Sequence, residues 1–265
     1  MASIKLTANY LLYKYFVQGV LHKVPFVGKK IKDYEELKQI ARDCGYKPGH
    51  FYSPIPSRKE VKDKADIIFA DRELLDIDLN VEEQFKLLKT FKNRSGEFPY
   101  DFLNNKESHN LRYRFTKRPQ YRYSDVIFLY NTILHLKPKR IIEIGSGASS
   151  AVMLDINDLF FDSSIDCTFI EPYPERLLTF LNDGDKKSCS IKKKKVQDVP
   201  IDIFTELQEN DILFVDSSHV SKVGSDLNHI FFEIFPRLKK GVWIHIHDIF
   251  YPFELPKHWI LNNSR

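Results

Sequence analysis

The chain has 265 residues, 43% of them hydrophobic and 29% charged, which allows one α/β domain, an appendage and a sizeable buried core. The formal net charge of +4 is small for this length and argues against a general nucleic-acid binder, which concentrates basic charge on one face. The sequence has no run of about 18 apolar residues, which argues against a transmembrane helix.

The cysteines and the N-terminal residues give the first indications of location and partners. Cys44, Cys167 and Cys189 have neither paired nor metal-like spacing, which indicates reduced thiols in a cytosolic protein. Residues 10–27 are rich in aromatic and branched apolar side chains, and they lack the small-residue cleavage site of a signal peptide. Two interpretations stay open for them, a helix docked on the domain or a partner, and an interfacial helix in peripheral contact with a membrane. Docking is the favoured one.

Residues 1–120 are predicted to form a helical and irregular N-terminal extension. Short helices are predicted over 34–43 and 81–91, the second with its apolar residues on one face. Residues 53–57 read Ser-Pro-Ile-Pro-Ser and must be extended, because each proline disfavours helix in the residue before it. Residues 93–122 are polar, aromatic and basic with few regular signals, which indicates a linker or a substrate lid.

Residues 121–265 alternate between helices and short apolar strands, which is typical of βαβ units. The predicted fold class is therefore α/β, a doubly wound and mostly parallel sheet. Strands are expected at 140–144, 167–170, 190–196, 211–215 and 242–246. Helices are expected at 124–136, 149–161, 176–181 and 225–238. The four lysines at 192–195 fit an edge strand that they protect against pairing with other sheets.

The first strand ends in Glu143-Ile-Gly-Ser-Gly and turns directly into a helix, as a cofactor seat does. Gly145 and Gly147 permit a tight turn and a close approach of the backbone to a ligand. The free amide groups of the following helix then face that ligand. Glu171 ends the adjacent strand, where its carboxylate can accept hydrogen bonds from both hydroxyls of a ribose. Together with Ser146, these residues predict a nucleoside-cofactor site.

Two residues favour S-adenosylmethionine over a dinucleotide as that cofactor. A dinucleotide fold needs a third glycine at position 150, where Ser150 stands. Glu143 suits the ammonium group of S-adenosylmethionine and would be unfavourable beside a pyrophosphate. An NAD(P)-dependent oxidoreductase remains an alternative, although no Tyr-x-x-x-Lys relay is found near the strand ends. A non-catalytic cofactor-binding or interaction protein is the third hypothesis.

The stretch from Ser124 to Asp248 resembles class I (Rossmann-like) S-adenosylmethionine-dependent methyltransferases, whose first motif reads acid-x-Gly-x-Gly. Residues 51–56, 142–147, 216–220 and 247–253 are similar to a bacterial-type subgroup of that class. The resemblance implies methyl transfer, with a hydroxylated small molecule, a sugar or a lipid-linked compound as the expected acceptor.

The resemblance also implies roles for individual residues around the cofactor. Ser149 and Ser150 would hydrogen-bond the methionine carboxylate. Asp198 follows the third strand, where the family often holds the adenine amino group. Asp216 ends the fourth strand and would face the transferred methyl group.

Polar side chains also follow the fourth and fifth strands, at the edge where open α/β sheets keep their chemistry. They are Asp216, His219, His247 and Asp248. In one mechanism Asp216, His247 and Asp248 bind Mg²⁺ or another divalent cation, which lowers the pKa of the attacking hydroxyl. In the other, His219 is the general base and the carboxylates orient it. Metal-dependent O-methyltransferases carry an acid pair after the fifth strand, where one member is here a histidine.

The sequence departs from the class after the fifth strand. Only residues 249–265 follow it, with two prolines, so the usual helix and antiparallel strand pair do not fit. The C-terminal strand pair is therefore expected to be missing and the fifth strand to be an open edge. Either a second copy of the chain covers this edge, or the chain is truncated.

Overall fold

The computed structural model describes residues 23, 25–43, 45–47, 49–75, 77–92, 98–100, 111–114, 121–182, 184–251 and 253–261. The contacts divide the chain into two compact units, Leu74–Ile249 and a second unit made of Met1–Glu73 and Phe250–Arg265. The predicted domain boundary at residue 120 stays a prediction.

The unit formed by the two chain ends is helical in its described part. Its helices are α2 (Pro25–Asp43), α3 (Arg58–Asp63), α4 (Ala65–Ile68) and α12 (Lys257–Leu261). Ser57 begins α3 as its N-cap, accepting a hydrogen bond from the Glu60 amide at 3.3 Å. Arg72 forms an ion pair with Glu254 at 2.8 Å, which links the two segments of this unit. The predicted helix over 10–27 lies almost entirely outside the described residues.

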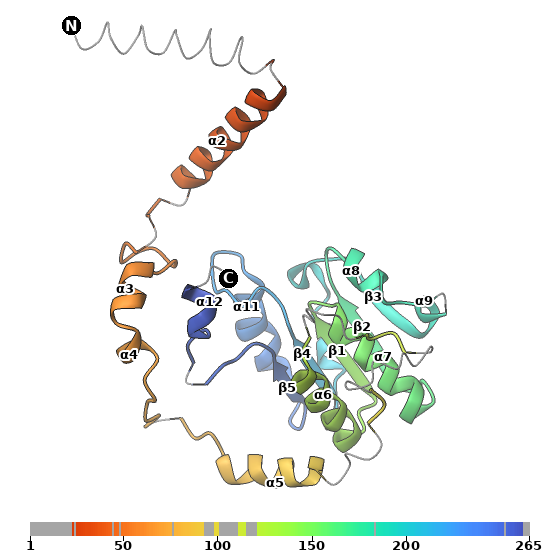
Figure 1. The fold of residues 1–265 in the computed structure, drawn as a ribbon. Coiled ribbons are helices and arrows are strands. Elements are labelled where there is room, and N and C mark those ends of the chain that lie inside the picture. The colour runs from red at the N-terminus through yellow and green to blue at the C-terminus, as the bar shows by residue number, and fades with distance from the viewer. Residues whose placement is uncertain are drawn as a thin grey trace, which may run out of the picture. The chain divides into compact units, whose positions relative to one another are not determined.

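The larger unit contains the predicted sheet (Figure 1). Its strands are β1 (Arg140–Ile144), β2 (Asp166–Ile170), β3 (Cys189–Lys192), β4 (Ile212–Val215) and β5 (Trp243–Ile246). They are all parallel in the order β3-β2-β1-β4-β5, which confirms the fold class. Ile144 pairs with Ile170 on one side and Val215 on the other. The strands therefore end level, and Gly145, Glu171 and Asp216 meet at one edge.

The other described elements of this unit are helical, and those that pack on the sheet cover both of its faces. They are α5 (Val81–Lys92), α6 (Tyr123–Leu136), α7 (Ala148–Phe161), α8 (Glu175–Leu178), α9 (Asp185–Ser188), η4 (Val196–Asp198), α10 (Asp202–Thr205), α11 (Asp226–His229), η5 (Ile230–Ile234) and η6 (Phe235–Arg237). The helix predicted over 225–238 is therefore three segments, in which η5 is a π-helix and η6 a 3₁₀ turn. Pro236 in η6 explains the change, because proline cannot donate the hydrogen bond that an α-helix requires.

Alternate residues of each strand form two separate cores, as the pleat of a sheet requires. Ile141 and Phe214 pack with α6 and α7 on one face. Ile142 and Leu213 pack with α10 and η5 on the other face. Glu143 lies in β1 and its side chain points to the face that α7 covers. It is fully buried, so an ionisable side chain lies inside an apolar layer.

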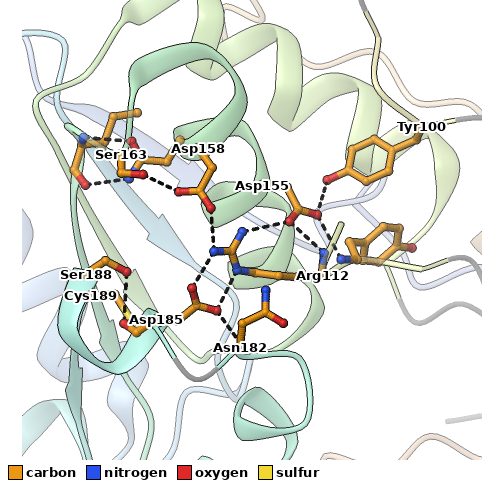
Figure 2. Close-up of polar contacts among 12 residues, drawn as sticks. Tyr100, Arg112, Asp155, Asp158, Ser163, Asn182, Asp185, Ser188 and Cys189 are labelled. Atoms are coloured by element: carbon orange, nitrogen blue, oxygen red, sulfur yellow. Dashed lines mark hydrogen bonds and ion pairs between the residues drawn. The ribbon is translucent and has the colours of Figure 1, made fainter. Parts of the chain in front are cut away.

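The stretch at 93–122, predicted as a linker or lid, is docked in its described part. Three of its tyrosines are buried in the core between the sheet and the helices α6 and α7: Tyr100, Tyr113 and Tyr121. Arg112 extends its guanidinium among three carboxylates, as Figure 2 shows, and Tyr100 donates a hydrogen bond to Asp155 at 2.9 Å. The aromatic and basic residues of this stretch follow no periodic pattern in the sequence. In the structure they bind residues of α7 and α9, which are far away in the sequence.

The sheet has an edge strand on each side. β3 is an edge, as the run of lysines predicts, and β5 ends the other side of the sheet in the part of the chain that the structure describes. Trp243 and Ile244 of β5, on opposite faces, are each 42% exposed.

Among the described helices, none has the length and apolar character needed to cross a membrane. Of the three cysteines, Cys167 and Cys189 are free thiols, and Cys44 lies outside the described residues.

Candidate functional site

The turn after β1 joins it tightly to the turn after β4. The Gly145 amide donates to the Ile170 carbonyl at 3.0 Å, and the Asp216 amide donates to the Ile144 carbonyl at 2.9 Å. Gly145 has a φ of +82°, and a Cβ at this position would lie 1.8 Å from the Asp216 carbonyl oxygen. Only glycine fits such an approach of two backbones. The predicted cofactor turn and the predicted reaction side are therefore one continuous site.

Glu143 of β1 holds the first turn of α7 through hydrogen bonds. Its carboxylate accepts hydrogen bonds from the hydroxyls of Ser149 and Ser150, and Ser150 Oγ also accepts from the Gly147 amide at 3.0 Å. From the family resemblance, the two serines were expected to hydrogen-bond the methionine carboxylate of the cofactor. In the structure their hydroxyl protons are directed at Glu143 instead. Ser150 thus replaces the third glycine of a dinucleotide fold with a hydrogen bond between helix and strand.

The buried position of Glu143 predicts a pH-dependent stability. Burial raises the pKa of Glu143 to about 8, and the charges of Asp216 and Glu171 act in the same direction, against the lowering effect of the two serine hydrogen bonds. The folded state therefore holds a proton on Glu143 at pH values where the unfolded chain has lost it. Its contribution to stability is full below about pH 4.5 and is lost as the pH rises through about 8.

We expect Glu143→Gln to remove this dependence. The free energy of unfolding of the wild type should fall relative to the variant by up to about 1.4 kcal/mol for each pH unit between these limits. Urea unfolding of both proteins between pH 5 and pH 8 measures the difference. A constant difference over this range would contradict the raised pKa.

Glu171 lies at the rim of the site, opposite the turn after β1. Its carboxylate accepts from the Ser146 amide at 3.3 Å and from the Tyr173 amide at 2.8 Å. These two amides orient the carboxylate, whose remaining lone pairs suit the two hydroxyls of a ribose. Asp198 is exposed in η4, and the neighbouring Gln197 donates through Nε2 to the Gly224 carbonyl at 2.9 Å. The predicted contact of Asp198 with adenine stays a prediction.

The residues present fit a nucleoside cofactor with an amino-acid end. Gly145 brings the backbone close, and Glu171 stands one strand away. Ser146 Oγ is buried and has no hydrogen-bond partner within the described part of the chain. Buried hydroxyls are rarely left without a partner in folded proteins, so this one is available to a ligand.

A histidine–carboxylate pair follows β4. His219 Nε2 lies 3.2 Å from Asp216 Oδ1, and both side chains are partly exposed. His219 has a φ of +55°, the left-handed region that residues other than glycine seldom adopt. Such backbone conformations are concentrated at functional sites, where the surrounding structure holds them. The pairing brings together the two residues that sequence analysis named as catalytic.

The residues after β5 form a second pair. His247 Nε2 lies 3.7 Å from Asp248 Oδ1, and Asp248 is also left-handed with a φ of +56°. His245 lies two residues earlier, within β5, and its ring stacks on that of Phe214 with 4.2 Å between the ring centres. Burial and the neighbouring His247 lower the pKa of His245 to about 4. His245 is therefore a neutral ring packed in the core layer.

The predicted metal site is not assembled as such. In the part of the chain that the structure describes, no three side chains of His, Cys, Asp or Glu are grouped to hold a metal ion. Asp216, His247 and Asp248 are distributed over the two pairs instead, and their joint binding of Mg²⁺ stays a prediction.

Three residues of this region were not predicted from the sequence. Tyr121 is buried, and its ring centre lies 5.2 Å from that of His247. Arg112 and Tyr113 belong to this region because the Tyr113 hydroxyl donates to the Tyr121 carbonyl. The only signal in the sequence is the aromatic character of an irregular stretch, which is too unspecific to indicate a site.

Comparisons with known proteins find one matching family and one similar sequence. Residues 142–249 match the model of a methyltransferase domain family. Over 181 residues the chain is 37% identical to an uncharacterized protein of Archaeoglobus fulgidus, a match that covers 65% of this chain and 79% of that protein.

Two solved structures are more distantly similar. The apo structure of CmcI shares 18% identity with a TM-score of 0.41, covering 65% of this chain and 73% of that one. The SAH-bound methyltransferase PaMTH1 of Podospora anserina shares 16% identity with a TM-score of 0.35, covering 75% and 74%. The family match over residues 142–249, the five-stranded parallel sheet and the acid-x-Gly-x-Gly turn all indicate one class. By these features the chain belongs to the class I S-adenosylmethionine-dependent methyltransferases.

Proposed function

We propose that this methyltransferase methylates a hydroxyl group of a small molecule, a sugar or a lipid-linked acceptor, with His219 as general base. The observation that carries the proposal is the 3.2 Å pairing of His219 Nε2 with Asp216 Oδ1 directly after β4. A hydroxyl is a weak nucleophile until its proton is removed, and a histidine is the side chain best suited to do this near neutral pH.

The pair assigns a tautomer to the histidine. Asp216 accepts the Nε2 proton, which leaves the lone pair of the neutral ring on Nδ1. There the ring takes up the proton of the acceptor hydroxyl, which makes the oxygen a competent nucleophile. When bound, S-adenosylmethionine would supply the electrophilic methyl group, and the carbon–sulfur bond would break with its electron pair staying on the sulfur, so that S-adenosylhomocysteine would be the leaving group. Asp216 keeps the ring oriented and stabilises the imidazolium that results.

We expect His219→Ala to reduce turnover about a hundredfold, within the range that general bases contribute. Methyl transfer from radiolabelled S-adenosylmethionine to free sugars, lipid-linked glycans and phenols measures the rate and identifies the acceptor class. Binding of S-adenosylhomocysteine should stay close to that of the wild type. Added imidazole should restore part of the rate, which a purely structural role of His219 would not allow.

The matched control is His135→Gln, a change of an exposed histidine in the last turn of α6. It should keep the wild-type rate. Full turnover of the His219→Ala protein, or a product methylated on nitrogen or sulfur instead of oxygen, would refute the proposed chemistry.

A further inference from the structure

Tyr121 carries a buried hydroxyl that is not used by the fold. The side chain is 3% exposed, and its hydroxyl has no hydrogen-bond partner among the residues that the structure describes. A buried hydroxyl without a partner has lost its hydrogen bonds to water and gained none in return, which destabilises the fold. Folded proteins keep few such groups, and those they keep need an explanation such as a role in ligand binding.

The position of Tyr121 is fixed from the backbone. The Tyr113 hydroxyl donates to the Tyr121 carbonyl, and the amides of Arg112 and Tyr113 donate to Asp155 of α7 at 2.8 and 3.0 Å. On the other side, the Arg122 amide donates to Asp125 at the start of α6. The phenol is thus held in place before any ligand binds.

The surroundings of the phenol identify the side of the site that it faces. Its ring lies against His247, which follows β5. Burial raises the pKa of Tyr121, and the nearby charges of Asp125, Glu143 and Asp216 raise it further, so that the hydroxyl keeps its proton. His247 in turn stacks on Phe214 of β4, so Tyr121 lies beside the ends of β4 and β5 as a neutral hydrogen-bond donor.

The strand order decides which part of the cofactor reaches this place. Glu171, the predicted ribose contact, ends β2, and the order of the strands is β2-β1-β4-β5. A cofactor with its ribose at Glu171 must extend its other end across β1 towards β4. Ser149 and Ser150 do not offer their protons there, because both donate to Glu143.

We propose that the Tyr121 hydroxyl donates a hydrogen bond to the carboxylate of the amino-acid end of S-adenosylmethionine. The inference rests on the proposed cofactor seat at Gly145 and Glu171. Tyr121 thereby replaces the two serines as the carboxylate contact, and Asp216 is left as the partner of the ammonium group.

Two ligands that differ only in the amino-acid part test this inference. S-adenosylhomocysteine contains it, whereas 5′-deoxy-5′-methylthioadenosine has the same adenosine and thioether without it. Calorimetric titration of Tyr121→Phe should show an affinity for S-adenosylhomocysteine about tenfold below the wild type, as expected for a hydrogen bond to a charged group. The affinity for methylthioadenosine should be unchanged. Tyr130→Phe, which removes another fully buried phenol from the same core, should alter neither.

The melting temperature of the ligand-free protein gives an independent readout. Removing a hydroxyl without a partner should leave it unchanged or raise it, whereas loss of a structural hydrogen bond would lower it. Equal affinities of wild type and Tyr121→Phe for S-adenosylhomocysteine would overturn this inference alone. An equal loss of affinity for both ligands would do the same. If the wild type binds neither ligand, the cofactor seat itself is refuted.

Discussion

Replacing Gly145 by alanine is expected to lower the free energy of unfolding by about 3–5 kcal/mol. The added Cβ would lie 1.8 Å from the Asp216 carbonyl oxygen and 2.7 Å from its carbon, both backbone atoms that no side-chain rotation can move away. The positive φ of Gly145 adds strain for any residue with a Cβ. The turns after β1 and β4 would have to separate, and with them the cofactor and reaction sides of the site.

Gly147→Ala is the matched control two residues away. Its Cβ would meet nothing closer than the Arg176 side chain at 3.6 Å, an ordinary contact. Urea unfolding should therefore show a change below about 1 kcal/mol for Gly147→Ala beside the large loss for Gly145→Ala. Similar stabilities of the two variants would show that the turns after β1 and β4 are not packed as tightly as described.

Arg112→Ala should destabilise the chain by about 3–5 kcal/mol, the usual effect of removing one partner from a buried ion pair. The Arg112 side chain is 6% exposed, and it contacts Asp185 at 2.5 Å, Asp158 at 2.6 Å and Asp155 at 3.2 Å. Two of these carboxylates, Asp155 and Asp185, are buried and would be left without their cation. Arg112→Lys should recover only part of the loss, because an ammonium cannot bind Asp185 through two parallel hydrogen bonds.

The loss of stability in Arg112→Ala should depend on pH. Arg112 lowers the pKa of Asp185 against the raising effect of burial, so the wild type gains stability from this pair above the ordinary range of an aspartate and loses it as the pH falls. The effect of Arg112→Ala should therefore be larger at pH 7 than at pH 4. As a control, Arg140→Ala, which breaks a longer and partly exposed pair with Asp211 at 3.8 Å, should change the stability by no more than about 1 kcal/mol. An Arg112 effect that does not depend on pH would contradict the ion-pair explanation.

The cluster around Arg112 also has a consequence for the site. The Tyr113 hydroxyl donates to the Tyr121 carbonyl, and the neighbouring Arg112 places its guanidinium between Asp155, Asp158 and Asp185, as Figure 2 shows. Loss of the cluster weakens the contacts of Arg112 and Tyr113 with α7 and α9, and with them the hydrogen bond that positions Tyr121. We therefore expect the affinity for S-adenosylhomocysteine to fall in Arg112→Ala as well, although Arg112 itself lies away from the strand ends.

The sequence by itself determined the sheet and the place of its chemistry. Short apolar runs between helices fixed all five strands to within a few residues, because burial on both faces leaves a strong local signal. The Gly145 turn, Glu171 and Asp216 were predicted at one edge, since parallel strands end at the same edge. His219 and Asp216, three residues apart, were close enough in sequence to be predicted as neighbours.

Only the tertiary structure decided how the polar groups are shared. Ser149 and Ser150 bind Glu143 instead of being directed to a ligand, because the packing of α7 on β1 buries all three side chains together. Arg112 meets Asp185 over 73 residues of sequence, and Tyr121 reaches His247 from the segment predicted as a linker or lid. Such pairings have no period and no fixed spacing, so their energy depends on the folded core and leaves no local pattern in the chain.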